Sequence, residues 1–456
     1  MHPSTASAAP AVLPLARCPS VRPSDWPRHV GARHNSAAKI GLLEGFHVLV
    51  LLCVFPCTVF WWPVYRSNVY GNLVLLDCAF LTLWTTSLAL LMRHSHLPFR
   101  TRQCVKVCVF AVLAGCGSAV GSLVYGQTAN LANDLLRHMK VLGFASIIPL
   151  SLSLASTARI HRLVAASAVL STTFNVAVRV TGYQDRLPLF TEFSDLGRIQ
   201  VVRPTGAVSN PNDYAYISIL GLAFAAALYS TRKRSAALPR ILCFGAIVAS
   251  LYGVVTSGSR SAIVGVLCGA VYYITRRRIS IAKKVGLVLM SALVLVIAWR
   301  ESSVFQDRMD AAMTQRLKEL NVVGRIEAQS IAVRTWFAWP LGVGASNMAA
   351  ATFPHSGDAQ LVTAVEGSDS IYVDYLLGAG IQGLVLLLLC FGTCWKLAAP
   401  VGPTSGTTVL QSTIVCIFVC GCASVAPASA FVSPFFFALV GLAALREMAP
   451  KAPRLS

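Results

Sequence analysis

The chain has 456 residues, of which 55% are hydrophobic and only 12% are charged, and its mean hydropathy is +0.64. Soluble domains carry about 25% charged residues, so this composition excludes an ordinary soluble protein and favours one that crosses a membrane many times. The net charge of +20 does not indicate nucleic-acid binding, because the basic residues form clusters between apolar segments rather than a patch interleaved with aromatic residues.

Most of the 14 cysteines occupy positions that are typical of small hydrophobic residues. Cys18 lies in the N-terminal segment, and the others lie in or beside apolar runs, which indicates buried thiols rather than a disulfide framework. Cys416, Cys420 and Cys422 are close in sequence, but no histidine or carboxylate accompanies them as a further metal ligand. The sequence therefore predicts no metal site and no cofactor.

The N-terminal residues 1–40 hold scattered basic residues and prolines, without the compact apolar core of a signal peptide. We expect this segment to be a basic cytoplasmic tail that precedes the first membrane helix.

From residue 41 onward, apolar segments recur at roughly the 20 residues that a helix needs to cross a bilayer. They predict an all-α polytopic membrane protein with about twelve transmembrane helices, helices 1–9 within 41–299 and helices 10–12 within 371–446. In chain order the segments are 41–63, 70–92, 104–126, 141–158, 163–182, 212–230, 241–259, 261–275, 285–299, 371–394, 408–426 and 430–445.

The arginine and lysine clusters between these segments predict the orientation of the chain. Basic clusters alternate with loops that contain fewer lysines and arginines, and cytoplasmic loops are the enriched ones. Both termini, including the tail 447–456, are therefore predicted to be cytoplasmic, and the two longer loops 183–211 and 300–370 to be periplasmic. The clusters lie at 93–106, 159–162, 232–240, 276–284 and 446–454.

The predicted loop 300–370 is long enough to have structure of its own. Apolar residues between Val304 and Phe337 recur at helical spacing with charges between them. This pattern predicts one or two amphipathic helices on the outer surface. Long structured loops are usually functional.

Three charged residues are brought to the outer side by this topology. Arg203 precedes one predicted helix, Arg260 lies between two, and Asp369 begins another. A fixed positive charge at the mouth of a helix bundle is costly unless an anionic group is bound there. The structural alternatives are that Arg203 contacts lipid headgroups and that Asp369 caps the helix that follows.

Four motifs follow one another along these outer segments. Arg203-Pro-Thr-Gly leads to Asn210-Pro-Asn212, and Ser-Gly-Ser-Arg260-Ser-Ala comes next. Gly324-Arg325 with Pro340-Leu-Gly342-Val-Gly344 precedes a last motif that runs from Asp369-Ser-Ile-Tyr372 to Gly380-Ile-Gln-Gly383. In order and spacing, residues 200–385 resemble the O-antigen ligase/polymerase superfamily.

The resemblance implies a GT-C-like membrane glycosyltransferase with a large structured periplasmic loop. Its relatives transfer a glycan, without a metal ion, from undecaprenyl diphosphate to an acceptor sugar hydroxyl at the periplasmic face of the bacterial inner membrane. Ligase members usually carry His-Asn-x-Tyr-Leu where this chain has Asp369-Ser370-Ile371-Tyr372-Val373. This departure favours the polymerase branch.

Carried onto this chain, the resemblance assigns roles to individual residues. Arg203 and Arg260 would hold the diphosphate, with Arg325 assisting, because guanidinium groups neutralise a leaving phosphate without a metal ion. Asp369 would orient or deprotonate the acceptor hydroxyl, and His355 is the competing base.

Other polar residues have two interpretations each. Asn210 and Asn212 could bind sugar or start a helix, and Tyr372 belongs to the substrate-binding motif that the resemblance implies. Asp77 and Asp374 are predicted to be intramembrane carboxylates, which are either functional or satisfied by a neighbouring serine or tyrosine.

The leading prediction is a polymerase of lipid-linked polysaccharide repeat units for exopolysaccharide, capsule or O-antigen. The first alternative is a ligase that transfers finished glycan to a lipid or protein acceptor. The second is a transporter or flippase of lipid-linked sugar, which should show internal repeats and charges near the midplane. Expected partners are the undecaprenyl-diphosphate-linked oligosaccharide and the bilayer. Chain-length regulators and export proteins are further partners that such a function implies.

Overall fold

The computed structural model describes most of the chain after residue 40. The ranges are 41–60, 74–93, 97–155, 158–182, 193–196, 199–202, 211–231, 237–276, 323–356, 370–398, 405–422 and 432–445, with a few isolated residues between them. Arg203, Asn210 and Asp369, both predicted tails and much of 300–370 lie outside the described residues, as does the side chain of Arg325.

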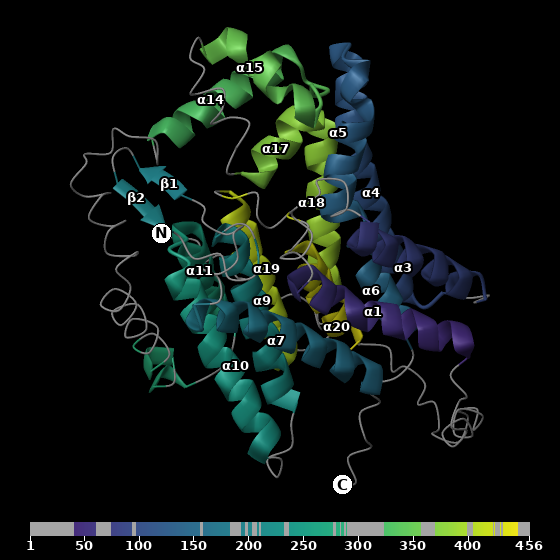
Figure 1. Ribbon diagram of the computed structural model, residues 1–456, viewed down its shortest axis with the longest axis vertical. Helices are drawn as coiled ribbons and strands as arrows, with labels where there is room; N and C mark the ends of the chain where they lie inside the picture. Colours follow the sequence, from purple (N-terminus) through teal and green to yellow (C-terminus); the bar gives the residue numbers. More distant parts are fainter. Residues whose placement is uncertain are drawn as a thin grey trace, which may run out of the picture. The chain divides into compact units, whose positions relative to one another are not determined.

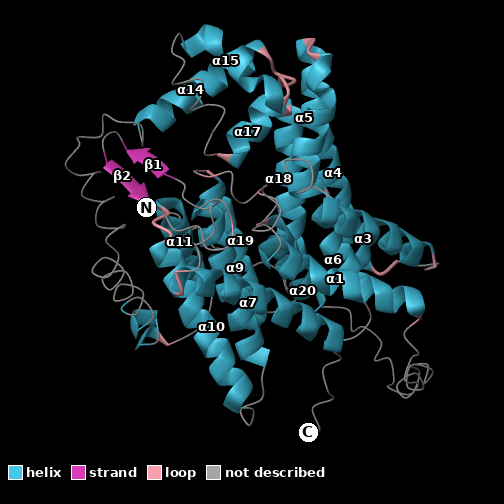
Figure 2. Cartoon of the chain, in the orientation of Figure 1, coloured by secondary structure: helices cyan, strands magenta, loops and turns pink. Residues whose placement is uncertain are grey.

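Helices dominate the described residues, and Figure 2 shows them with one short hairpin. The first helices are α1 (Leu42–Phe60), α3 (Val74–Met92), α4 (Phe99–Tyr125), α5 (Leu131–His138), α6 (Ile147–Leu154) and α7 (Ala158–Val180). They are followed by α9 (Pro211–Thr231), α10 (Ala237–Thr256), α11 (Arg260–Arg276), α14 (Val323–Ala338) and α15 (Met348–Ser356). The last are α17 (Ile371–Gly378), α18 (Gly380–Ala398), α19 (Ser405–Gly421) and α20 (Ser433–Leu445) (Figure 1).

Five of the described helices are long and apolar enough to cross a membrane: α1, α4, α7, α10 and α18. Shorter apolar helices occur within α3, α19 and α20. The prediction of a helical membrane protein is therefore supported, while the count of about twelve spans stays a prediction.

Two predicted spans have a different structure from a single helix. Segment 141–158 contains the end of a π-helix, η5 (Met139–Gly143), then a turn and the eight-residue helix α6. Segment 371–394 is divided into α17 and α18 at Gly378–Gly380, because Gly380 adopts φ +71°, a backbone conformation that ends a helix. Hydropathy does not register either break, since the residues around it are apolar.

A short hairpin lies within the predicted loop 183–211. Strands β1 (Phe193–Leu196) and β2 (Ile199–Val202) pair antiparallel, with Phe193 opposite Val202 and Leu196 opposite Ile199.

Small residues let α11 and α19 pack closely. A Cβ atom on Gly265 would clash with the Cys420 thiol and lie 2.9 Å from the carbonyl oxygen of Cys416. A Cβ atom on Gly269 would lie 2.7 Å from the carbonyl oxygen of Ser412. This Gly-x-x-x-Gly spacing is the one that brings membrane helices into backbone contact.

A second, smaller apolar cluster joins α14, α15 and α17. The face of α14 that packs into it carries Ala328, Ile331 and Ala332, whereas Phe337 on the other side is exposed. Part of the predicted amphipathic stretch 305–339 is thus a helix with one buried face. The cluster also contains Val343, Ala345, Met348, Ala351 and Leu377.

Candidate functional site

The first turns of α9 and α11 meet at a group of hydroxyl and amide side chains. Asn212 Oδ1 accepts a hydrogen bond from Ser259 Oγ at 3.0 Å, and the Ser259 and Ser261 hydroxyls lie 3.2 Å apart. The Tyr216 hydroxyl lies 2.9 Å from Ser261 Oγ. Residues Asn212, Tyr216, Ser257, Ser259, Arg260 and Ser261 are called the α9–α11 junction below.

The local sequence explains why α11 begins at Arg260. The link from α10 is only Ser257-Gly258-Ser259, in which Gly258 adopts φ +62° and the Ser257 hydroxyl accepts from the Ser259 amide at 3.1 Å. Arg260 is therefore held, partly buried, between two serines that contact α9. Helix N-termini carry partial positive charge, so the joined ends of α9 and α11 and the guanidinium group together favour an anion. The buried carboxylate of Asp213 stands in the first turn of α9.

The C-terminal end of α19 connects this junction to α17. The Cys420 thiol lies 3.3 Å from the carbonyl oxygen of Ser261. On the other side of α19, Ser370 Oγ donates to the Gly421 carbonyl at 3.2 Å and the Tyr372 hydroxyl donates to the Phe418 carbonyl at 2.9 Å. The motif Ser370–Tyr372 is thus connected through one helix end to the start of α11.

The loop Pro340–Gly344 fills the break between α17 and α18. The Val343 and Gly344 amides donate to the carbonyl oxygens of Leu377 and Gly378 at 2.9 and 3.0 Å. Carbonyl groups that a broken helix leaves unpaired are satisfied in this way. Gly121 of α4 must lack a side chain, since a Cβ atom there would lie 2.7 Å from the Gly344 nitrogen.

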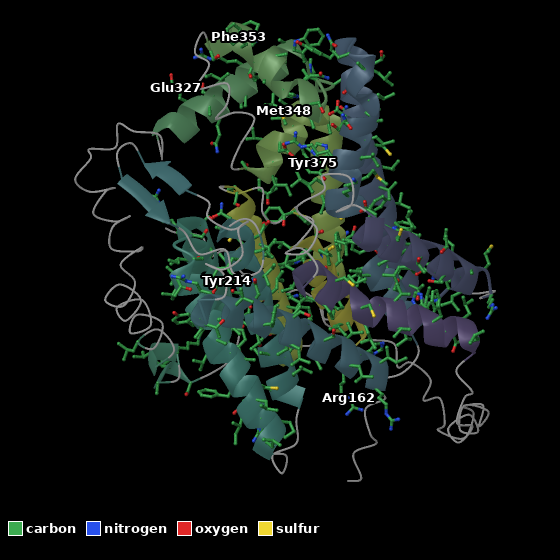
Figure 3. All side chains as sticks on the ribbon, viewed as in Figure 1. Arg162, Tyr214, Glu327, Met348, Phe353 and Tyr375 are labelled. Atoms are coloured by element: carbon green, nitrogen blue, oxygen red, sulfur yellow. The ribbon has the colours of Figure 1, made fainter. Side chains whose placement is uncertain are left out.

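Helix α5 contacts α17 through charged side chains. His138 Nε2 donates to Asp374 Oδ2 at 2.9 Å, and Arg137 Nη2 lies 3.8 Å from Asp374 Oδ1. Because a carboxylate can only accept, Nε2 carries the proton in this bond. The rings of His138 and Tyr375 lie 4.5 Å apart; Figure 3 labels Tyr375, and Figure 1 shows α5 beside α17.

The same helix also holds the loop that follows Gly344. Asp134 Oδ1 accepts from the Ser346 amide at 2.6 Å, and Asp134 Oδ2 accepts from the Ser122 hydroxyl. Arg137 donates to the carbonyl oxygen of Ala345 at 3.3 Å. Asp134 and His138 are four residues apart and so lie on one helix face. Residues Asp134, Arg137, His138, Ser346 and Asp374 are called the α5 junction below.

The charge on Asp374 is stabilised by its neighbours. Helix α17, with eight residues, is not among the helices that are long enough to span a membrane. Burial raises the pKa of Asp374, but the hydrogen bond and charge of His138 and the charge of Arg137 outweigh it, so the pKa lies below its ordinary value. The carboxylate is consequently ionised at neutral pH.

The predicted site residues fall into separate places. Asn212 and Arg260 lie together at the α9–α11 junction, and Tyr372 lies across α19 with its hydroxyl on a backbone carbonyl. His355 is exposed near the end of α15. Asn212 opens α9 as the structural interpretation expected, and it also makes the contact to Ser259.

Sequence reasoning missed the residues of α5. The partners of the two carboxylates are nitrogen groups rather than a serine or tyrosine, since Asp374 is bound by His138 and Asp77 by Lys140 at 3.7 Å. The sequence did offer a signal for these partners, because a group of polar residues stands between two apolar segments: Asp134, Arg137, His138 and Lys140. Buried carboxylates need a partner that stabilises their charge, so such a group marks where one is available.

Comparison with known families adds the decisive observation. Residues 245–388 match the family model of O-antigen ligase (Wzy_C). This segment, about a third of the chain and called the O-antigen ligase segment below, is similar to the O-antigen ligase family. Members of that family are membrane glycosyltransferase-like enzymes, and no curated protein is similar enough in sequence to add a closer relative.

The O-antigen ligase segment contains Arg260, the loop Pro340–Gly344, α17 and the first nine of the 19 residues of α18. The predicted resemblance is therefore confirmed over that segment. Helices α4, α5 and α9 and the described end of α19 lie outside it, yet they supply Asn212, Asp134, His138 and the carbonyls that hold Ser370 and Tyr372. The site thus combines the O-antigen ligase segment with helices before and after it.

Proposed function

We propose that this protein polymerises lipid-linked polysaccharide repeat units by glycosyl transfer from undecaprenyl diphosphate. The observation that carries the proposal is Arg260, fixed between Ser259 and Ser261 at the joined N-termini of α9 and α11, inside the O-antigen ligase segment. Positive helix ends and a guanidinium group are suited to a diphosphate.

In the proposed reaction, the acceptor hydroxyl oxygen forms a bond to the anomeric carbon as the bond from that carbon to the diphosphate oxygen breaks. The proton of the hydroxyl passes to Asp369, and the bonding electrons leave with undecaprenyl diphosphate. A single displacement inverts the anomeric carbon. Arg260, together with Arg203 and Arg325, neutralises the charge that grows on the leaving group, so the reaction needs no metal ion.

Asp369 is supported as the base by its neighbour along the chain. Ser370, the next residue, is held on the Gly421 carbonyl of α19, and the adjacent Cys420 contacts the carbonyl of Ser261. Ser370 is thereby attached to the helix end that also contacts the α9–α11 junction, and Asp369 is the carboxylate that precedes it in the sequence. A base must come within hydrogen-bond reach of the acceptor.

A ligase is the second candidate, because the matching family is described as O-antigen ligase. A ligase would transfer the finished glycan to a lipid or protein acceptor. Asp369, in place of the histidine that ligases usually carry there, favours polymerisation. We place the reaction at the periplasmic face of the inner membrane, with both termini cytoplasmic, on the distribution of basic residues.

The test is chain growth by purified protein in detergent with undecaprenyl-diphosphate-linked repeat units isolated from the producing strain. Arg260→Ala should reduce the rate about 100- to 1000-fold. Arg260→Lys should remain impaired, because lysine cannot bind two phosphate oxygens at once. Asp369→Asn should abolish elongation, and Arg334→Ala, which alters an exposed residue, is the matched control. His355→Ala tests the competing base and should keep the normal rate.

Several outcomes would refute the proposal. Elongation at the normal rate by both Arg260→Ala and Asp369→Asn would remove the assigned site. Loss of activity in EDTA that magnesium restores would remove the metal-independent mechanism. Transfer of a single finished glycan to a lipid acceptor, without chain growth, would identify the ligase instead, and detergent-solubilised elongation excludes transport as the activity measured.

A further inference from the structure

We propose that α5, which lies outside the O-antigen ligase segment, is a positioning element for the acceptor side of the site and acts through the His138–Asp374 pair. The inference rests on the proposed function, since the residue that α17 carries into the reaction is the one that precedes Ser370. The described side-chain contacts of α5 with the O-antigen ligase segment are to α17 and to the loop after Gly344. They do not include the assigned diphosphate site.

Helix α17 depends on lateral contacts for its position. It has eight residues, and the break at Gly378–Gly380 separates it from α18, so the long helix cannot set its direction. Its start is held by α19 through Ser370 and Tyr372, and its end by the loop amides of Val343 and Gly344. Between these ends, Asp374 is held by α5.

Helix α5 controls two of these three attachments. His138 and Arg137 bind Asp374 directly, while Asp134 binds the Ser346 amide just after the loop that holds the end of α17. A movement of α5 would therefore displace both the middle and the end of α17. Residue 369 lies just before this short helix, and a misplacement of about 1 Å at a reacting group costs about 100-fold in rate.

The contact between His138 and Asp374 is specific. The His138 side chain is only 2% exposed, and within the part of the chain that the structure describes its Nδ1 atom has no hydrogen-bond partner. The Nε2 bond to Asp374 is thus the described hydrogen bond of this ring, and the Tyr375 ring packs against it. Arg137, 47% exposed, adds charge at a longer distance.

The second carboxylate pair of the same region provides a control. Asp77 of α3 pairs with Lys140 of η5 at 3.7 Å, and both side chains are about as buried as that of Asp374. This pair joins helices without touching α17. Removing it should affect stability without changing the reaction of the acceptor.

The experiment measures thermal stability and acceptor kinetics together. The donor is the lipid-linked repeat unit at saturation, and the acceptor is a benzyl-capped repeat-unit oligosaccharide. His138→Leu leaves Asp374 with only the longer contact to Arg137, and Asp374→Leu leaves His138 Nε2 without its partner, so each should lower Tm, whereas the double variant should recover much of it. We expect the double variant to keep a kcat/KM for the acceptor about 100-fold below wild type, with an unchanged KM for the donor.

Conservative variants test the same inference if the double variant fails to fold. His138→Gln keeps a donor for Asp374 and should restore kcat/KM to within a few-fold of wild type, while Asp374→Asn should remain low. Asp77→Leu combined with Lys140→Leu should keep a normal kcat/KM. A well-folded double variant or Asp374→Asn with normal acceptor kinetics would overturn the inference, and so would an equal loss in the Asp77/Lys140 control.

The same assay separates this inference from the proposed function. If Arg260→Ala abolishes elongation but the His138 and Asp374 variants are normal, only the positioning role of α5 is wrong. If Arg260→Ala is also normal, the proposed site itself fails.

Discussion

The α9–α11 junction and the α5 junction hold their helices together with different chemistry. At the first, hydroxyl and amide groups of Asn212, Tyr216 and three serines make the described contacts around Arg260. At the second, Asp134 accepts from the Ser346 amide and the Ser122 hydroxyl, and Asp374 accepts from His138 and lies 3.8 Å from Arg137. Neutral contacts align the helix ends at the first junction, where the buried carboxylate of Asp213 also stands in the first turn of α9, whereas carboxylate contacts fix the orientation of α17 at the second.

The two junctions should therefore respond differently to substitution. Breaking one neutral hydrogen bond costs about 1 kcal/mol, because water replaces part of the interaction. Leaving a buried charge without its partner costs about 3–5 kcal/mol. We expect changes at the α5 junction to show first as lost stability, and changes at the α9–α11 junction to show first as lost rate.

The largest effect is expected from Gly344→Val at the α5 junction. Gly344 adopts φ +84°, and a Cβ atom there would clash with the Ser122 hydroxyl and lie 2.6 Å from Asp134 Oδ2. We expect a loss of at least about 4 kcal/mol, seen as little folded protein after extraction. Gly392→Val is the matched control, since nothing lies within 4 Å of a Cβ atom there. Normal yield for Gly344→Val would show that the loop can dock elsewhere.

The next effect concerns Asn212→Ala at the α9–α11 junction. This change removes the acceptor of the Ser259 hydroxyl, so the first turns of α9 and α11 lose a shared contact. We expect about 1–2 kcal/mol lower stability and roughly tenfold lower kcat/KM for the lipid-linked donor. Thr275→Ala removes a hydroxyl-to-backbone bond at the other end of α11 and should leave the rate unchanged. Equal rates for Asn212→Ala and Thr275→Ala would show that Asn212 does not contribute to the site.

A smaller effect is expected from Tyr372→Phe, on the α19 side that joins the two junctions. The hydroxyl donates to the Phe418 carbonyl, and the ring packs on Phe418 at 5.4 Å, which phenylalanine preserves. We expect a stability loss of about 1 kcal/mol and a rate within about threefold of wild type. A loss beyond tenfold at unchanged Tm would instead support the substrate-binding role that the family resemblance implies.

The smallest effect is a pH dependence of the α5 junction. Since the pKa of Asp374 is depressed in the folded protein, its stabilisation is present above the unfolded value of about 3.9 and is lost as pH falls through the lower folded value. Asparagine mimics the protonated form. The Tm difference between wild type and Asp374→Asn should thus be full at pH 7 and narrow below about pH 4. A constant difference across this range would show that geometry, not charge, makes the contact.

By itself the sequence determined the class of the protein and the position of the helix start that carries Arg260. Hydropathy is a local property, so the runs at 41–63, 163–182 and 241–259 correspond to α1, α7 and α10 with small shifts at their ends. The sequence also places Arg260 at the start of a helix after the short link Ser-Gly-Ser, as the structure has it, because a glycine turn and a helix start depend on adjacent residues.

Only the tertiary structure decided which distant residues meet. His138 and Asp374 are 236 positions apart, and the loop that fills the break after α17 comes from residues 340–344. The apolar residues of 371–394 look like one helix, since the kink needs a positive φ at Gly380 and amide donors that arrive from elsewhere in the chain. Long-range pairing of polar groups depends on packing, and neither hydropathy nor spacing along the chain encodes it.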